Sequence, residues 1–171
     1  RLFTHVFNAS GPLHHRRPGA LGAALTDDRL TVTLIADGVH VHPAVIRLVW
    51  RAKPAGGVVL VTDAVAWRSA RSSDRGVAHV DGAPRLPDGT LAGSSLTMPE
   101  AVRGAVTAGV DLADAVTAAS TTPAALLGLA DRGAIAPGRR ADLVALDGGL
   151  RVQAVWCGGA LAAQPPAGNG E

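Results

Sequence analysis

Residues 31–63 read TVTLIADGVHVHPAVIRLVWRAKPAGGVVLVTD, and this stretch decides the fold class of the chain. Two apolar runs in it, 31–36 and 57–62, are rich in β-branched residues, which is typical of parallel strands buried on both faces. The segment between them, 42–53, is expected to form a helix with Pro43 in its first turn. The order strand, helix, strand predicts an α/β fold with parallel pairing. The apolar positions spaced for one face of this helix are Val45, Leu48 and Val49.

Beyond residue 65 the pattern becomes less regular and then helical. Residues 66–93 are rich in Gly, Pro, Asp, Ser and Arg, which predicts a long loop with a short hairpin at 77–80. The run Thr97-Met98-Pro99-Glu100 is a capping box that starts a helix. Further helices are expected from Asp111 and from Thr122. The residues expected to face inward are Val102, Ala105 and Val106 in the first of these helices, and Leu112, Ala115, Val116 and Ala119 in the second.

The C-terminal part returns to strand-like patterns. Residues 141–146 (ADLVAL) and 152–157 (VQAVWC) are expected to form two short strands joined by a hairpin turn at 147–149. Strands that follow a helical stretch predict a small, separate β-layer. Residues 164–171 (QPPAGNGE) are expected to form a frayed, disordered tail.

Composition excludes several classes of protein. Hydrophobic residues make up 47% of the chain and charged residues 18%, which suits a packed core and not a disordered chain. The formal charge of +2 is small and scattered, which argues against a nucleic-acid surface. The single cysteine, Cys157, excludes a disulfide framework, and no apolar run is long enough to cross a membrane. A cytoplasmic protein is therefore expected.

Four polar residues are predicted to lie near the ends of strands. Asp37 and Asp63 end the two apolar runs, His40 follows Asp37 by three residues, and His5 follows the apolar start of the chain. In parallel α/β folds that edge of the sheet carries the active site. Taken singly, each residue also fits a structural role as a cap, a turn former or a hydrogen-bonded histidine. Spacing alone leaves the structural and the functional interpretation open.

The chemistry of these residues suggests a metal-assisted hydrolysis. A neutral imidazole at His5 suits zinc or iron. A carboxylate at Asp63, beside a metal-bound water, is suited to take the water's proton and later deliver it to a leaving amine. Arg16 offers a forked donor for a phosphate or a carboxylate, although the basic run His14-His15-Arg16-Arg17 is equally compatible with a solvated loop.

Five motifs in the chain, in this order, resemble those of N-acetylglucosamine-6-phosphate deacetylases, which belong to the amidohydrolase superfamily. The first and the last of them together are the most specific part of the resemblance, which extends over residues 1–161. The motifs are THVFNA at 4–9, RRPG at 16–19, IADGVH at 35–40, LVTDA at 60–64 and DGTLAGSSLTM at 88–98.

The resemblance implies a particular architecture. Residues 1–133 correspond to the C-terminal part of a TIM-like (β/α)8 barrel that forms a metal-dependent hydrolase domain. Residues 134–163 correspond to C-terminal strands of a small β-domain, and 164–171 to the disordered tail. The chain is therefore expected to be truncated relative to the family, and we expect it to be inactive on its own.

The resemblance also implies roles for individual residues. His5 is a metal ligand, and Asp63 is the general base and then the general acid. His40 contacts the sugar phosphate and helps to polarise the amide carbonyl, while Arg16 binds the phosphate, reaching the site of a neighbouring subunit in a dimer. The remaining substrate-binding positions are Asn8 and Ala9, largely through backbone groups, and Leu91, Ala92 and Gly93.

The implied reaction is hydrolysis of the acetamide of N-acetylglucosamine 6-phosphate, which yields glucosamine 6-phosphate and acetate. The implied cofactor is a divalent metal, zinc or iron, and the implied partner is a second subunit, with no nucleic acid and no membrane. The family's other metal ligands, a Glu and a His from a Gly-His-Ser stretch, come before His5, and this chain contains neither motif. The alternatives are another amidohydrolase acting on a different N-acyl sugar or a cyclic amide, and a non-catalytic fragment.

Overall fold

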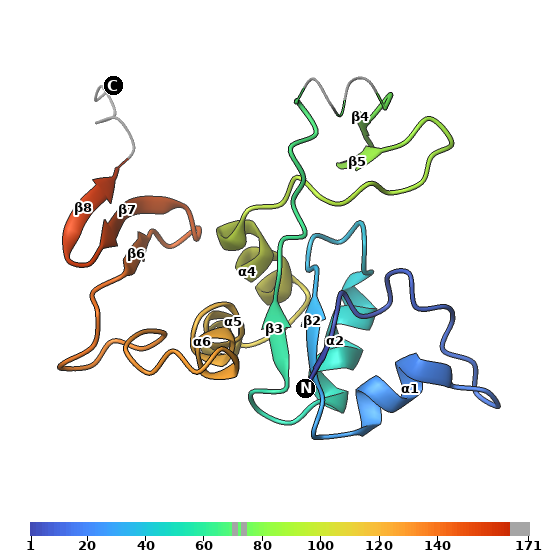
Figure 1. The fold of residues 1–171 in the computed structure, drawn as a ribbon, viewed down its shortest axis with the longest axis horizontal. Coiled ribbons are helices and arrows are strands. Elements are labelled where there is room, and N and C mark those ends of the chain that lie inside the picture. Colours follow the sequence, from blue (N-terminus) through green and yellow to red (C-terminus); the bar gives the residue numbers. More distant parts are fainter. Residues whose placement is uncertain (70–71, 73–74, 165–171) are drawn as a thin grey trace.

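A computed structural model describes residues 1–69, 72 and 75–164 (Figure 1). The described part contains two three-stranded sheets separated by helices, and a two-stranded hairpin lies at one end. Apart from Gln164, the expected disordered tail lies outside the described residues. No helix in the described ranges has both the length and the apolar character needed to cross a bilayer.

The first sheet is parallel, as predicted from residues 31–63. It contains β1 (Leu2–Phe3), β2 (Thr31–Leu34) and β3 (Val58–Leu60), in the order β1-β2-β3. The β-branched runs form the strands because each run is buried almost completely. The mixed α/β class predicted from the sequence is therefore confirmed.

Alternate residues of β2 and β3 contribute to opposite faces of this sheet. Val32 and Leu34 in β2 belong to the hydrophobic core formed with the helices, and so do Val58 and Leu60 in β3. Thr33, between the two core residues of β2, is also buried but stands outside that core cluster. Since successive side chains of a strand point to opposite faces, the sheet is covered on the helix side by apolar packing and presents Thr33 on the other side.

Helix α2 (Pro43–Ala52) connects β2 to β3, as predicted, but its buried face differs from the prediction. Its buried residues are Ile46 and Val49, whereas Leu48 is 46% exposed. The predicted inward position of Leu48 is therefore wrong. The helix carries enough apolar residues to supply more than one face, and packing against α1 (Gly19–Thr26) and α4 (Met98–Thr107) selects one of them.

Three helices follow the long loop. They are α4 (Met98–Thr107), α5 (Leu112–Ala119) and α6 (Thr121–Leu126). The capping box is confirmed, because one carboxylate oxygen of Glu100 accepts hydrogen bonds from the backbone N–H and the hydroxyl of Thr97. The predicted face of α5 is partly wrong. Ala115 and Ala118 are buried, whereas Leu112 and Val116 are more than 40% exposed.

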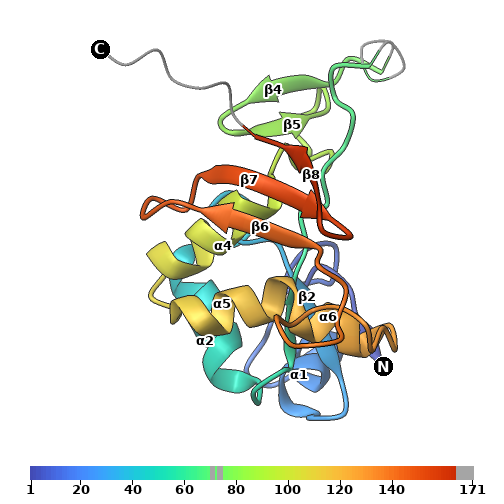
Figure 2. The ribbon, with the colours of Figure 1, turned by 90° about the vertical axis from the view of Figure 1, so that its left-hand side faces the viewer.

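The remaining strands form two antiparallel sheets (Figure 2). The hairpin expected at 77–80 is formed by β4 (Ala78–Val80) and β5 (Ala83–Arg85). The predicted C-terminal strands are β6 (Leu143–Leu146) and β7 (Val152–Cys157), and β8 (Ala160–Ala163) joins them as a third strand that the sequence pattern did not predict. Helices α4, α5 and α6 lie between this sheet and the parallel one (Figure 1). Arg103 in α4 donates hydrogen bonds to the carbonyls of Gly149 and Leu150 in the β6–β7 turn.

The packing of α4 on the end of β2 gives a prediction about stability. A Cβ at Gly104 would lie 1.8 Å from the carbonyl oxygen of Ala36, which is backbone and cannot rotate away. Gly104→Ala is therefore expected to lower the free energy of unfolding by at least about 1–3 kcal/mol. The sign of this change in the free energy of unfolding is informative, because Gly→Ala in an unobstructed helix stabilises the protein by about 1 kcal/mol.

Urea unfolding followed by tryptophan fluorescence would measure this effect. Gly148→Ala is the control, since a Cβ there meets nothing within 4 Å and its φ is not positive. Equal stabilities for Gly104→Ala and the unmodified chain would contradict the close approach of α4 to Ala36.

Candidate functional site

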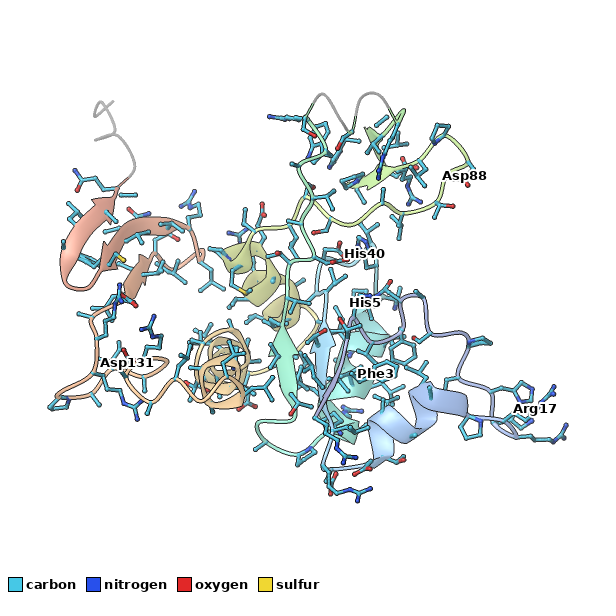
Figure 3. The ribbon with its side chains drawn as sticks, viewed as in Figure 1. Phe3, His5, Arg17, His40, Asp88 and Asp131 are labelled. Atoms are coloured by element: carbon cyan, nitrogen blue, oxygen red, sulfur yellow. The ribbon has the colours of Figure 1, made fainter. Side chains whose placement is uncertain are left out.

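The predicted site residues lie along one edge of the parallel sheet. The ladder continues past the strands, because the Val6 N–H donates to the Thr33 carbonyl (2.8 Å) and the Val61 N–H donates to the Leu34 carbonyl (3.1 Å). In a parallel sheet all strands end at the same edge, so the segments that carry His5, His40 and Asp63 emerge together. Figure 3 places the side chains of His5 and His40 beyond the carboxyl ends of β1 and β2.

A fourth segment joins this edge next to Asp63. Ser94 forms a parallel bridge with Ala64, its N–H donates to the carbonyl of Asp63 (2.9 Å), and its hydroxyl donates to the carbonyl of Thr62. Gly93 is in the left-handed region (φ +82°), and a Cβ there would lie 2.6 Å from a methyl group of Val65 and 2.9 Å from the Asp63 carbonyl. Only glycine fits this close approach, which holds the predicted substrate positions 91–93 against the exit of β3.

His5 is held by its own loop and by β2. Its backbone N–H donates to the hydroxyl of the buried Thr33 (2.6 Å), and its ring Nδ1 is 3.1 Å from the carbonyl oxygen of Asn8. A carbonyl acceptor at Nδ1 favours the tautomer that leaves Nε2 free to bind a cation. Asn8 in turn donates from its side-chain amide to the carbonyl of Val6 (3.3 Å), which ties the loop together.

Backbone strain is concentrated in the same region. His5, Phe7, Ala9 and Asp63 all have positive φ, with values of 29°, 72°, 53° and 50°. Such conformations cost about 1–3 kcal/mol each for residues other than glycine, so they persist only where surrounding contacts hold them. Strained positions of this kind cluster at functional sites, and here they coincide with three of the predicted site residues.

His40 is buried together with Asp37. One carboxylate oxygen of Asp37 is 2.6 Å from His40 Nδ1, and the other accepts hydrogen bonds from the backbone N–H groups of Val39 (2.9 Å) and His40 (2.8 Å). Burial by itself raises the pKa of Asp37, but the hydrogen bonds from the His40 ring and from these two N–H groups outweigh it, so the pKa lies below the usual value. Asp37 is therefore ionised at neutral pH.

Asp63 is exposed in this chain. Hydrogen bonds among the described residues hold its backbone in place, but not its side chain. The carbonyl of Asp63 is bound by Ser94, and the next N–H, that of Ala64, lies 3.4 Å from the Thr62 hydroxyl. This arrangement leaves the carboxylate free to reach a substrate.

Arg16 is not brought to this edge. It is exposed in the loop before α1, in a tight turn where its N–H donates to His14 Nδ1 (3.2 Å) and His14 stacks on His15. The adjacent Arg17 marks the position of this turn in Figure 3, at the right-hand edge of the molecule and away from His5 and His40. Arg16 therefore does not belong to the site formed within one copy of this chain.

The other histidines have local partners. His42 caps α2 by accepting from the Ala44 N–H (3.2 Å), and His79 in β4 lies 2.9 Å from the Ser95 hydroxyl through Nε2. A cavity of about 390 Å³ lies between α2, α4 and the hairpin tip, with Asp37 and Ser95 in its lining, but it does not include His5 or Asp63. At the strand edge itself, Asp63 is exposed, whereas the side chains of Asp37 and His40 are buried.

The described ranges contain no group of three or more His, Cys, Asp or Glu side chains placed to hold a metal ion. His5 is suited to be one metal ligand, because its Nδ1 is within hydrogen-bond distance of the Asn8 carbonyl and its Nε2 is available. Any complete ligand set therefore needs groups that the described part of this chain does not supply.

One contributor to the site, Thr33, and one contact, that between Asp37 and the His40 ring, were not predicted from the sequence. Thr33 lies inside an apolar strand, and only the neighbouring β1 explains its hydroxyl. Asp37 was noticed as a strand-end carboxylate, but its contact with the His40 ring was not predicted. The three-residue spacing of Asp37 and His40 was the available signal, and Gly38 between them (φ +76°) marks the tight turn.

Comparison with known proteins gives consistent similarities. Residues 4–163 match the amidohydrolase family. A protein of Escherichia coli, named as a candidate N-acetylgalactosamine-6-phosphate deacetylase, is 43% identical over 92% of this chain and 98% of its own length. The N-acetylgalactosamine-6-phosphate deacetylase of another Escherichia coli strain is also 43% identical over 92% of this chain, but this region is only 44% of its length.

A solved structure is similar as well. It is an N-acetyl-D-glucosamine-6-phosphate deacetylase variant from Mycobacterium smegmatis in complex with N-acetyl-D-glucosamine 6-phosphate, and it superposes with a TM-score of 0.83 at 36% identity. The superposition covers 94% of this chain and 45% of that chain. The chain thus spans nearly all of one short relative and less than half the length of the other two.

Proposed function

Because this chain belongs to the amidohydrolase family, we propose that it forms the C-terminal part of a deacetylase acting on N-acetylglucosamine 6-phosphate. The reaction hydrolyses the acetamide and gives glucosamine 6-phosphate and acetate. The observation that carries this proposal is the convergence of His5, His40 and Asp63, three residues far apart in sequence, at one edge of the parallel sheet. The names of the similar proteins support the choice of an acetylated amino sugar 6-phosphate as substrate.

The proposed architecture is the second half of a TIM-like (β/α)8 barrel. Strands β1, β2 and β3 are parallel and lie side by side in sequence order, and Ser94 adds a parallel bridge to Ala64 beyond the end of β3. In such barrels the active site lies at the carboxyl ends of the strands, which is where the four candidate segments emerge. The proposed boundaries are 1–133 for the barrel part and 134–163 for the strands of a small β-domain.

Amidohydrolases generally use a divalent metal ion, and we assign His5 Nε2 as one of its ligands. Zinc or iron suits an imidazole ligand, and the remaining ligands come from segments beyond this chain. When bound, such an ion would lower the pKa of its water toward neutrality and so supply hydroxide. The role of the chain's own residues is to orient His5, through the Thr33 hydroxyl and the Asn8 carbonyl.

Asp63 is the proposed acid and base. Its carboxylate takes a proton from the water as the water's oxygen attacks the acetyl carbonyl carbon. The same carboxyl group then donates that proton to the amine nitrogen as the carbon–nitrogen bond breaks. Exposure of the carboxylate and fixation of its backbone by Ser94 both support this assignment.

The remaining residues are proposed to hold the sugar. Asn8 and Ala9 offer backbone groups from the strained loop, and Leu91, Ala92 and Gly93 line the sugar beside Asp63. His40 contacts the sugar phosphate and helps to polarise the amide carbonyl. The resemblance assigns Arg16 to the phosphate in the neighbouring subunit's site of a homodimer, and an exposed Arg16 side chain is compatible with that role. A cytoplasmic location, without nucleic-acid or membrane partners, completes the proposal.

A second candidate substrate is N-acetylgalactosamine 6-phosphate, favoured by the names of two relatives that are 43% identical to this chain. The two sugars differ in the orientation of one hydroxyl group. Acetate release from both 6-phosphates, measured side by side, decides between them. A different N-acyl sugar or a cyclic amide as the only substrate would overturn both candidates, and a non-catalytic fragment would release no acetate from any of them.

The assay needs a competent form that includes the missing ligands. We define it as the N-terminal part of the Mycobacterium smegmatis deacetylase, up to the position equivalent to Arg1, joined to this chain. We expect it to release acetate from a 6-phosphorylated N-acetyl amino sugar in the presence of zinc. Failure to do so with a folded protein that binds metal would contradict the proposed function.

A specificity prediction concerns Arg16. In the competent form, Arg16→Ala is expected to lower the catalytic efficiency for the 6-phosphorylated sugar by about 10–100-fold, because a charge-assisted hydrogen bond contributes about 1.5–3 kcal/mol. The unphosphorylated sugar should be affected much less. Arg29→Ala is the control, since Arg29 is also exposed and pairs only with Asp27. Equal losses for both sugars would rule out a phosphate role, and mixed dimers would show whether Arg16 acts across the interface.

A further inference from the structure

The Asp37–His40 pair carries a specific arrangement of protons. Asp37 lies three residues after the end of β2, and its two carboxylate oxygens make different contacts. Oδ1 accepts the N–H groups of Val39 and His40, which shapes the turn, while Oδ2 lies 2.6 Å from Nδ1 of the His40 ring. The two side chains are only 10% and 4% exposed, so water does not substitute for this contact.

The other ring nitrogen of His40, Nε2, is buried and lacks a hydrogen-bond partner among the described residues. A buried polar atom without a partner costs about 1–3 kcal/mol, so such an atom indicates a place for an external group. The ring is thus anchored at one nitrogen and unpartnered at the other, and His40 lies at the strand edge that carries Asp63.

We propose that Asp37 is a positioning residue: it keeps the proton of His40 on Nδ1 and turns Nε2 toward the substrate. This inference rests on the proposed function, in which His40 contacts an anionic substrate. In this arrangement the Nδ1–H group of His40 donates to the Asp37 carboxylate. A substrate phosphate is bound by the ring that carries a proton on both nitrogens, and the Asp37 carboxylate is then its counter-ion.

The low pKa of Asp37 supports this arrangement, since an ionised carboxylate only accepts hydrogen bonds and so requires the proton on Nδ1. The simpler alternative is that Asp37 only shapes the turn through Oδ1. Asparagine separates the two roles, because its side-chain oxygen can still accept both N–H groups while its NH₂ group faces Nδ1 as a donor. An amide at this position would therefore move the ring proton to Nε2 without removing the turn.

The first measurement is the tautomer of His40 in the competent form. Long-range ¹H–¹⁵N correlation spectra report which ring nitrogen carries the proton, and the signals of His40 are those lost in His40→Gln. We expect the Nδ1–H form in the unmodified protein and a large population of the Nε2–H form in Asp37→Asn. The Nε2–H form in the unmodified protein would overturn the proposal, whether or not the variant folds.

The second measurement is kinetic. Asp37→Asn is expected to lower catalytic efficiency for the 6-phosphorylated sugar by about 10–100-fold, with a smaller effect on the unphosphorylated sugar. In a His40→Gln background the same change should have little further effect, because the residues act as one unit. Asp88→Asn is the matched control: Asp88 likewise accepts a backbone N–H two residues on, that of Thr90 (2.9 Å), but faces no ring.

The outcomes distinguish this inference from the proposed function. If His40→Gln leaves the efficiency with the phosphorylated sugar unchanged, the substrate role of His40 fails, whatever Asp37 does. If His40→Gln is damaging but Asp37→Asn changes neither the tautomer nor the efficiency by more than twofold, the positioning role of Asp37 is wrong. An equal loss for Asp37→Asn in the presence and absence of His40 would also overturn it.

Discussion

Asp63→Asn is expected to lower the kcat of the competent form by about 10²–10⁴-fold, with substrate affinity changed by no more than a few-fold. The amide keeps the shape of the side chain but cannot take a proton from water or return one to the leaving amine. Asn also tolerates the left-handed backbone found at this position (φ 50°), so the change should not disturb the fold.

Asp81→Asn is the matched control for this experiment. Asp81 has nearly the same backbone conformation (φ 48°) but lies in the turn between β4 and β5. It should retain full activity and the same melting temperature. Turnover of Asp63→Asn within a few-fold of the unmodified protein would remove Asp63 from the chemistry, and a large loss of activity in Asp81→Asn would point to a general effect of the substitution.

The 171-residue chain on its own is expected to show no deacetylase activity and only weak zinc binding. A catalytic zinc site uses about three protein ligands and keeps a position for water, whereas the described residues supply no such group. The sheet also has an unpaired edge at β1, and large apolar side chains such as Leu127 (71% exposed) and Ile135 (90% exposed) lack cover. Both features favour self-association of the isolated chain.

Three measurements check this expectation, with the competent form as the positive control. They are acetate release with added zinc, calorimetric titration of zinc, and size-exclusion chromatography with light scattering. Metal-dependent acetate release from a monodisperse, isolated chain would contradict the prediction. It would mean that histidines assigned here to structural roles, such as His14, His15 or His42, complete the metal site.

Local patterns were sufficient for much of the fold. The two β-branched runs predicted β2 and β3 and their parallel pairing, because strands buried on both faces need continuous apolar residues. The capping box at Thr97 and Glu100 predicted the start of α4, since its two hydrogen bonds are made within four residues. The ordered motifs implied the resemblance to amino sugar deacetylases, and the amidohydrolase match over 4–163 confirms the family.

Local sequence patterns did not predict which face of α2 and α5 is buried. Leu48, Leu112 and Val116 were expected to face the core, and all three are exposed, while Ile46 and Ala118 are buried. In a chain so rich in Ala, Val and Leu, several helix faces are apolar enough to be buried. The choice among them depends on which neighbour packs against the helix, and that is a property of the whole fold.

The sequence alone was sufficient to predict where the buried strands end and which polar residues follow them. Strand ends and turns depend on neighbours within a few positions, so a local pattern is enough. Tertiary structure alone decided that Thr33 holds His5, that a Cβ at Gly93 would meet the Asp63 carbonyl, and that Nδ1 of His40 faces Asp37 while its Nε2 has no partner among the described residues. These contacts depend on the register of parallel strands and on the exact path of a turn. Both are fixed by packing and hydrogen bonds between segments that can be tens of residues apart, so a local sequence pattern does not predict them.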